Sequence, residues 1–125
     1  MHRSRIGVFL IDHPASSYDD ALRFWGGVQG VEPVPEEGDD DYASLGRVGS
    51  VKLEGQRLGD GGPRLHLDIE TDDVAAEVGR VVDLGATVIQ ERKSFTVLQD
   101  PGGLIFCVVS VQTGDDFERE AITWP

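Results

Sequence analysis

A histidine and two carboxylates alternate with apolar residues in the stretch RLHLDIETDD, which begins at Arg64. In an extended strand, successive side chains point to opposite faces, so His66, Asp68 and Glu70 are expected to share one face. An imidazole beside carboxylates can act as a general base, bind a metal ion, or line a polar cavity. Neighbours two positions apart on a strand are about 7 Å apart, so contact between His66 and Asp68 requires both side chains to reach. His66 and Asp68 are therefore the candidate catalytic residues, with all three uses open.

The polar residues on this face of the strand could also have purely structural roles. The carboxylate of Asp68 or Glu70 could form an ion pair with Arg57 or Lys52 from another strand. His66 alone could be a hydrogen-bonded polar residue in the wall of a cavity.

Cys107 and Trp124 are two further residues whose types could serve a site. Cys107 stands in LIFCVVS, where a cysteine is typical of a small buried hydrophobe. A nucleophilic role would need a nearby cation to stabilise the thiolate, and His66 is the available partner. Trp124, second from the end of the sequence, is expected to be anchored to the subunit's own surface, to a dimer partner, or to the rim of a ligand site.

The charge balance excludes some function classes. The 125 residues include 11 Lys and Arg against 23 Asp and Glu, a net charge of −12. This argues against a nucleic-acid partner, because such binding depends on basic side chains that neutralise phosphates. No apolar run approaches the roughly 20 residues that span a bilayer, so no membrane partner is expected. The single cysteine excludes an intramolecular disulfide framework and fits a cytoplasmic location.

The hydrophobic pattern predicts the elements that position these residues. We expect a buried strand over 5–11 and a helix over about 18–30, capped by Ser16 or Ser17. Three extended segments are expected over 31–35, 42–48 and 50–58, with an acidic turn, EEGDDD, between the first two.

After a Gly-rich linker over 59–63 the pattern restarts. A strand over 65–70 leads to a helix that Thr71 is expected to cap and Gly85 to end. Strands are expected over 86–91, 95–99 and 104–111. Both halves therefore follow the order strand, helix, strand, strand, strand. We predict one α+β domain over 1–125, with module 1 at about 5–58, linker 59–63, module 2 at about 64–111 and a C-terminal tail over 112–125.

This order resembles the vicinal oxygen chelate superfamily, which includes glyoxalase I, extradiol dioxygenases and bleomycin-resistance proteins. The best local matches are RLHLDIETDDVAAEVGRVVDLGA (64–86) and DPGGLIFCVV (100–109), together with the FW pair in the first helix. They are similar to small glyoxalase-like proteins common in high-GC Gram-positive bacteria. The resemblance implies two tandem βαβββ modules that form a curled β cup with the helices outside.

The resemblance also implies a ligand set for a divalent metal, two residues from each module. His66 and Cys107 fall at the two positions in module 2. Ile6 or Gly7 falls at one position in module 1, and Gln56 at the other with Glu54 on the same face. The usual four-ligand set is thus incomplete, and no cofactor is predicted. If a divalent metal is present, His66, Cys107 and either Glu54 or Gln56 are its expected ligands.

We therefore expect a cytoplasmic, homodimeric, glyoxalase-like protein that binds a small organic ligand. The expected ligand-binding residues are Glu54, Gln56, His66, Cys107 and Trp124. Metal-free acid–base catalysis by His66 and Asp68 is one outcome, and whether the chain is an enzyme stays open. A first alternative is a non-catalytic protein of the bleomycin-resistance type, which the acidic charge favours but an aromatic content of 7% does not. A second alternative is a metal-dependent lyase, isomerase or dioxygenase that uses His66.

Overall fold

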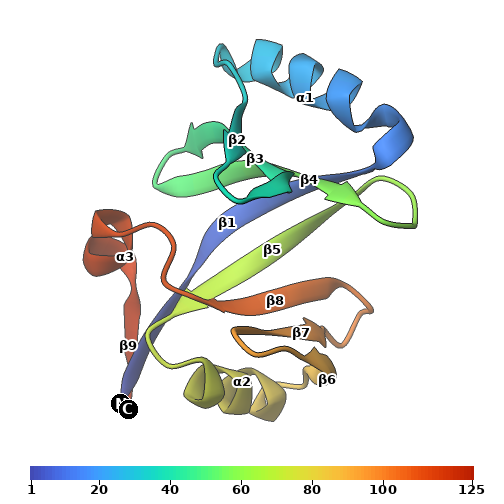
Figure 1. Cartoon of the computed structure of the whole chain (residues 1–125). Helices are drawn as coiled ribbons and strands as arrows, with labels where there is room; N and C mark the ends of the chain where they lie inside the picture. Colours follow the sequence, from blue (N-terminus) through green and yellow to red (C-terminus); the bar gives the residue numbers. More distant parts are fainter. The chain divides into compact units, whose positions relative to one another are not determined.

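The computed structural model describes all 125 residues, in nine strands and three helices (Figure 1). The first βαβββ run is β1 (His2–Pro14), α1 (Ala15–Gln29), β2 (Val34–Glu36), β3 (Asp39–Val48) and β4 (Val51–Leu58). The second run is β5 (Arg64–Thr71), α2 (Val74–Asp83), β6 (Thr87–Glu91), β7 (Phe95–Gln99) and β8 (Ile105–Ser110), followed by α3 (Asp115–Glu120) and β9 (Ile122–Trp124). The predicted α+β class with two βαβββ modules is confirmed. None of the three helices has both the length and the apolar character needed to cross a membrane.

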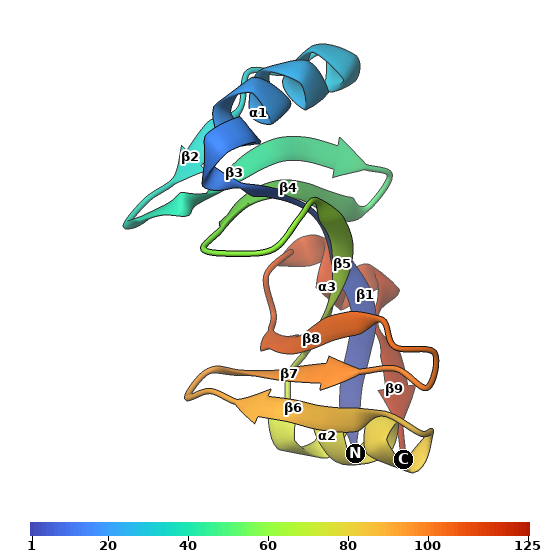
Figure 2. The same cartoon turned by 90° about the vertical axis from the view of Figure 1, so that its right-hand side faces the viewer.

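The chain divides into two compact units. Unit 1 comprises Met1–Val8 and His66–Pro125, and unit 2 comprises Phe9–Leu65. Strand β1 therefore begins in unit 1 and ends in unit 2. In each unit the sheet is open rather than closed, with β6 as an edge strand of unit 1 and β2 as an edge strand of unit 2 (Figure 2).

In unit 2, the antiparallel strands β2, β3 and β4 lie side by side, and α1 packs on β3 and β4. Tyr18 on α1 is buried, with 3% of its surface exposed. A Cβ atom at Gly55 on β4 would lie 2.4 Å from Cδ2 of Leu22 on α1, so any larger residue there would force the side chain of Leu22 to move.

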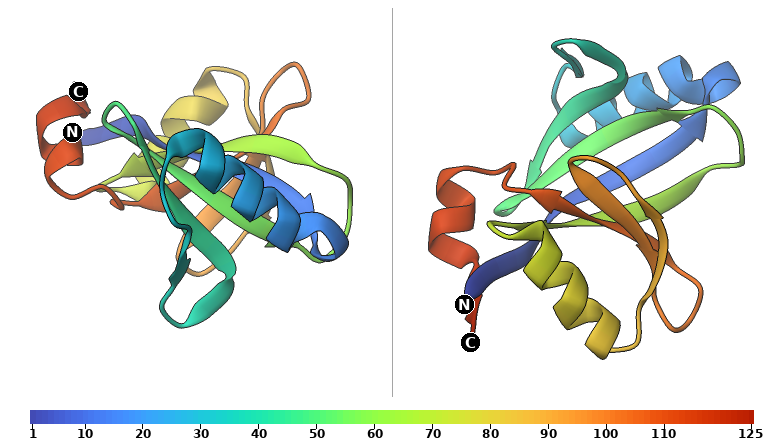
Figure 3. Two further views of the ribbon diagram at one scale, coloured as in Figure 1. Left: turned by 90° about the horizontal axis from the view of Figure 1, so that it is seen from above. Right: turned by 60° about the horizontal axis from the view of Figure 1, so that its bottom comes forward.

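In unit 1, the strands follow the order β5-β8-β7-β6, with β5 and β8 parallel and the other pairs antiparallel. Helix α2 covers one face of β7 and β8 (Figure 3). The buried cluster on that face consists of Val81, Leu98, Phe106 and Val108. Leu67 and Ile69 of β5 pack against it, so the alternate residues of β5 and β8 point to the opposite face.

The strand bounds differ from the predicted ones by up to a few residues. Strand β1 is longer at both ends than the predicted 5–11, whereas the segment predicted over 31–35 is a strand only from Val34. The last residues of the predicted acidic turn belong to β3, which begins at Asp39. Asp39 pairs with Glu36 of β2 across the turn at Glu37 and Gly38, so the turn is present but shorter than predicted.

Both predicted helix caps are wrong. Helix α1 begins at Ala15 after Pro14, and no side chain caps it, so Ser16 and Ser17 lie inside its first turn. Helix α2 is capped by Asp73, whose side chain accepts a hydrogen bond from the backbone N–H of Ala76 at 3.0 Å.

Thr71 has a different task because it still belongs to β5. Its Oγ1 donates to the carbonyl oxygen of Arg3 at 2.7 Å and accepts from the backbone N–H of Asp73 at 3.1 Å. Thr71 therefore joins β5 to β1 instead of capping α2.

The predicted tail over 112–125 is an ordered part of unit 1. Strand β9 pairs antiparallel with the start of β1, so both chain ends lie together (Figures 1 and 2). Helix α3 buries Phe117, which has 1% of its surface exposed. Its sequence, DDFERE, contains one apolar residue, too few to show helical periodicity.

Candidate functional site

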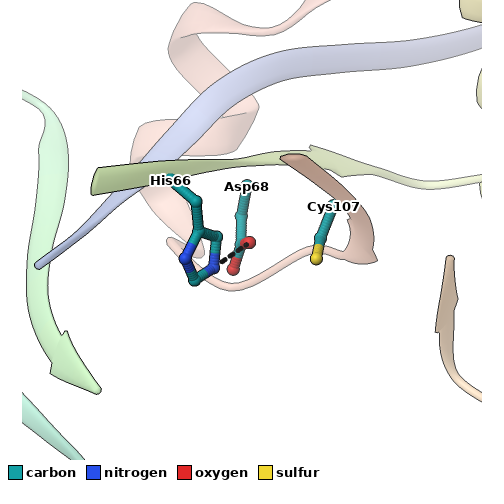
Figure 4. Close-up of side chains that lie close together, drawn as sticks. All are labelled: His66, Asp68 and Cys107. Atoms are coloured by element: carbon teal, nitrogen blue, oxygen red, sulfur yellow. Dashed lines mark ion pairs between the residues drawn. The ribbon is translucent and has the colours of Figure 1, made fainter. Parts of the chain in front are cut away.

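Three of the predicted site residues converge in unit 1 (Figure 4). Strand β5 supplies His66 and Asp68, and β8 supplies Cys107. The parallel register of these strands pairs Asp68 with Cys107, which brings the two side chains next to each other. Each of the three residues offers one ligand atom, and these atoms all lie within 4.8 Å of one another.

The side chains of His66 and Asp68 approach each other across the spacing between alternate strand positions. Nε2 of His66 lies 3.6 Å from Oδ1 of Asp68, and the two side chains are 11% and 10% exposed. Such burial strengthens the attraction between a carboxylate and a protonated imidazole, because water screens it less. The carboxylate can therefore orient the ring and stabilise its charged form.

Cys107 lies on the same polar face of the sheet. It is partly buried, whereas its neighbours Phe106 and Val108 belong to the core cluster on the other face. Its apolar neighbours in the sequence indicated a core position, but strand alternation turns its thiol away from the cluster.

Glu70, the third polar residue of the stretch, has a structural role. Its side chain is fully buried, and its Oε2 lies 3.0 Å from Nε of Arg5. Oε1 accepts hydrogen bonds from the backbone N–H groups of Gln112 at 2.7 Å and Thr113 at 3.0 Å, and Oε2 accepts from Oγ1 of Thr113 at 2.6 Å. A Cβ atom at Gly7 would lie 2.2 Å from Oε2, so the carboxylate fills the space beside this glycine. Glu70 therefore stabilises the fold, and it is not part of the site that His66 and Asp68 form.

The predicted ion pairs of this strand with Arg57 or Lys52 are wrong. Nε of Arg57 lies 3.0 Å from Oδ1 of Asp41, and Nζ of Lys52 lies 2.8 Å from Oε1 of Glu54. Glu70 pairs instead with a cation on β1, a partner that is distant in sequence and that no local pattern identifies.

Glu54 and Gln56, the other predicted ligand-binding residues, lie on β4 in unit 2. Glu54 is 6% exposed and holds the ion pair with Lys52. Nε2 of Gln56 donates to the hydroxyl of Tyr42 at 3.0 Å. Both side chains therefore have partners within their own unit.

Trp124 is anchored on its own subunit. Strand β9 pairs it with His2, and its Nε1 donates to Oγ of Ser4 at 2.9 Å. The guanidinium of Arg80 stacks on its ring at 3.8 Å from the centroid. Of the three alternatives predicted from the sequence, the structure therefore shows Trp124 anchored to the subunit's own surface.

A second buried carboxylate, Glu77 on α2, lies beside Trp124. Its Oε1 is 2.7 Å from Nε2 of His2, and its two oxygens accept hydrogen bonds from Nε and Nη2 of Arg80 at 2.8 Å each. Burial opposes ionisation of Glu77, but the hydrogen bonds from Arg80, His2 and Ser4 outweigh it and hold its pKa below the ordinary value. No pattern in the sequence identified this group, because its members come from β1, α2 and β9.

The donor set of the converging residues suits a divalent metal. An imidazole nitrogen, a carboxylate oxygen and a thiolate sulfur are the ligands that Zn²⁺ takes in proteins. Asp68 was predicted as an acid–base partner and not as a ligand. The signal that identifies it is the HLD spacing, which places both polar side chains on one face of one strand.

The chain matches the family model of the glyoxalase-like domain over residues 9–109. No curated protein matches it. Among solved structures, it is similar to a hypothetical protein from Bacillus halodurans C-125, with a TM-score of 0.64 at 16% identity over 87% of this chain and 95% of that one. It is also similar to a methylmalonyl-CoA epimerase in complex with methylmalonyl-CoA and NH4+, with a TM-score of 0.61 at 19% identity over 89% and 97% of the two chains.

A third similar structure is a glyoxalase/bleomycin resistance protein/dioxygenase superfamily member from Vibrio splendidus 12B01. Its TM-score is 0.54 at 17% identity, over 82% of this chain and 96% of that one. At such identities the likeness establishes the fold, which hosts many chemistries. With the family match over residues 9–109, it shows that this chain belongs to the glyoxalase-like domain family and has the fold of the glyoxalase/bleomycin resistance/dioxygenase superfamily.

Proposed function

We propose that the chain binds a small organic ligand over the polar face of β5 and β8, with His66 at the centre of the site. The observation that carries this proposal is the convergence of His66, Asp68 and Cys107 on one face, with ligand atoms within 4.8 Å of one another. Three polar side chains that converge and are largely withdrawn from water are typical of the few polar groups that orient a ligand.

The proposed chemistry is proton transfer by His66. The neutral imidazole removes a proton from a carbon next to a carbonyl group, and Asp68, 3.6 Å away, stabilises the resulting imidazolium. The protonated imidazole then delivers the proton to a neighbouring carbon of the ligand, which completes an isomerisation, or to the departing group as its bond to the ligand breaks, which completes a lyase-type elimination. The epimerase with the same fold supports this reaction class, because epimerisation moves a proton at one carbon.

A metal-dependent lyase or isomerase is the second candidate, favoured by the three different donor atoms. His66, Asp68 and Cys107 would hold the ion, which would supply Lewis-acid polarisation of a ligand oxygen.

A panel of small carbonyl and thioester compounds tests the proposal. We expect a ligand of this panel to raise the melting temperature and to exchange a carbon-bound proton for deuterium, as followed by NMR. His66→Gln should lower the exchange rate by about 10²-fold or more, because it removes the general base. His13→Gln, which alters a histidine of unit 2, should leave the rate unchanged.

Two results would redirect the proposal. Ligand binding without exchange or product, in the wild type, would favour the sequestering alternative of the bleomycin-resistance type. Full affinity and full exchange in His66→Gln would remove His66 from the site.

We further propose that residues 1–125 form one domain and that the protein is a cytoplasmic homodimer. The single cysteine supports the location, and the exposed apolar side chains of Phe24 and Val28 on α1, 62% and 61% exposed, support association. Light scattering coupled to size exclusion measures the subunit number, and a monomeric mass at micromolar concentration would contradict the dimer.

A further inference from the structure

We propose that unit 1 alone provides a binding site for a thiophilic divalent ion of the zinc class, held by one atom each of His66, Asp68 and Cys107. This inference rests on the second candidate of the proposed function, because an imidazole whose Nε2 binds an ion cannot also be the base that removes a proton through that atom. It differs from the ligand set that the resemblance implies in two respects: Asp68 is a ligand, and no ligand comes from module 1.

The separations of the donor atoms fit a tetrahedral ion. With a Zn–N bond of about 2.0–2.1 Å and a Zn–S bond of about 2.3 Å, two ligands of one ion are roughly 3.3–3.8 Å apart. Nε2 of His66 and Oδ1 of Asp68 are 3.6 Å apart, within this range. Every pair of donor atoms lies within 4.8 Å, so the distances from the sulfur of Cys107 exceed the upper end of this range by at most roughly 1 Å, a shift that rotation of side chains supplies.

The sulfur of Cys107 determines which ions bind. Mg²⁺ and Ca²⁺ take oxygen ligands, and a thiolate is a soft ligand that favours Zn²⁺ and similar ions. Three protein ligands leave one tetrahedral position open, as in catalytic zinc sites. The open position is where an oxygen of the proposed organic ligand would bind.

The backbone holds the three donors before any ion arrives. Hydrogen bonds between β5 and β8 fix Asp68 beside Cys107, and Phe106 and Val108 anchor β8 in the core cluster. A preformed arrangement of this kind loses little conformational entropy on binding.

The side chains of module 1 that the resemblance assigns to a metal have other partners. Glu54 is paired with Lys52 at 2.8 Å, and Gln56 donates to Tyr42 at 3.0 Å. Recruiting Glu54 to an ion would break a largely buried ion pair, which is costly. Asp68 therefore supplies the carboxylate that module 1 does not.

Titration of the tag-free, metal-depleted protein with Co²⁺, followed by displacement with Zn²⁺, tests the donor set. We expect one ion per chain and a sulfur-to-cobalt charge-transfer band. Cys107→Ser should abolish that band. Cys107→Ser and Asp68→Asn should each weaken Zn²⁺ binding by at least the roughly 100-fold that loss of an outer-shell partner can cost. Mg²⁺ should not compete.

The matched controls are Glu54→Gln, which alters the alternative carboxylate, and Asp60→Asn, which removes one charge from an exposed loop. Both should leave Zn²⁺ affinity within about twofold of the wild type, since neither supplies a ligand. Urea unfolding of each metal-free variant establishes that it is folded.

Three results would overturn the inference: no Co²⁺ binding by the wild type, a charge-transfer band that persists in Cys107→Ser, or a loss of affinity in Glu54→Gln as large as that in Asp68→Asn. Binding of organic ligands to the metal-free protein is measured in parallel. If an organic ligand binds and no ion does, this inference is wrong and the proposed function stands. If an ion binds and no organic ligand does, the proposed function is wrong and this inference stands.

Discussion

At the level of single residues, the buried position of the Glu70 side chain depends on the absence of a side chain at Gly7. The buried carboxylate accepts three hydrogen bonds from residues 112 and 113 and pairs with Arg5, and it does so in space that any side chain at position 7 would occupy. A charge so far from water is tolerated only because all of these partners are present.

We expect Gly7→Ala to lower the free energy of unfolding by about 2–4 kcal/mol, because the added methyl group displaces the carboxylate from its partners. Urea denaturation measures the change. Gly79→Ala is the control, because a Cβ there contacts nothing within 4 Å and position 79 lies inside α2. Alanine should stabilise that helix by roughly 0.5–1 kcal/mol. Equal stabilities of wild type and Gly7→Ala would contradict the account of Glu70.

The residues of the site show what a sequence can predict. Alternation along RLHLDIET indicated that His66 and Asp68 share a face, and the structure brings them to 3.6 Å. The same alternation grouped Glu70 with them, although its partners lie on β1 and in the segment after β8. That Cys107 lies beside Asp68 follows from the parallel register of β5 and β8, which no local pattern encodes.

At the scale of the element, α2 is tied to both ends of the chain through Glu77. Its carboxylate contacts His2 on β1 and Arg80, and Arg80 stacks on Trp124 of β9. Local sequence predicted α2 and the strands around it, because each has a clear apolar period. The local sequence did not predict α3 and β9, because these two elements are held in place by contacts with β1.

The pH dependence of stability follows from the lowered pKa of Glu77. A carboxyl whose folded-state pKa lies below its unfolded-state value contributes stability that is fully present above the unfolded-state value. That contribution is lost as the pH falls through the folded-state pKa. We therefore expect Glu77→Gln to lose less stability than the wild type when urea unfolding is repeated from neutral pH down to about pH 3.

Glu120→Gln is the control for this experiment, because it alters an exposed carboxyl at the end of α3. It should show the same loss of stability on acidification as the wild type. Parallel pH profiles for the wild type and Glu77→Gln would refute the role of Glu77.

At the scale of the whole molecule, the net charge of −12 acts on folding as self-repulsion. Raising NaCl from about 0.01 M to about 1 M shortens the screening length from about 30 Å to about 3 Å. We expect the free energy of unfolding in urea to rise by on the order of 1 kcal/mol over this range.

A variant with Glu37→Gln and Asp40→Asn, both exposed near the β2–β3 turn, should respond less to salt because its net charge is less negative. A fall in stability with salt would mean that the local ion pairs outweigh the general repulsion.

The division of β1 between the two units bears on how the chain folds as it is synthesised. Residues 9–65 leave the ribosome as one continuous stretch and hold all the strands and the helix of unit 2. The first eight residues emerge before them, yet their partners in unit 1 are made later: Thr71, which binds Arg3, and the chain end, which pairs with His2. Arg3 therefore meets its partner only after Thr71 has been made, and His2 only after Trp124 has been made. His66, Asp68 and Cys107 all belong to unit 1, which is completed after unit 2.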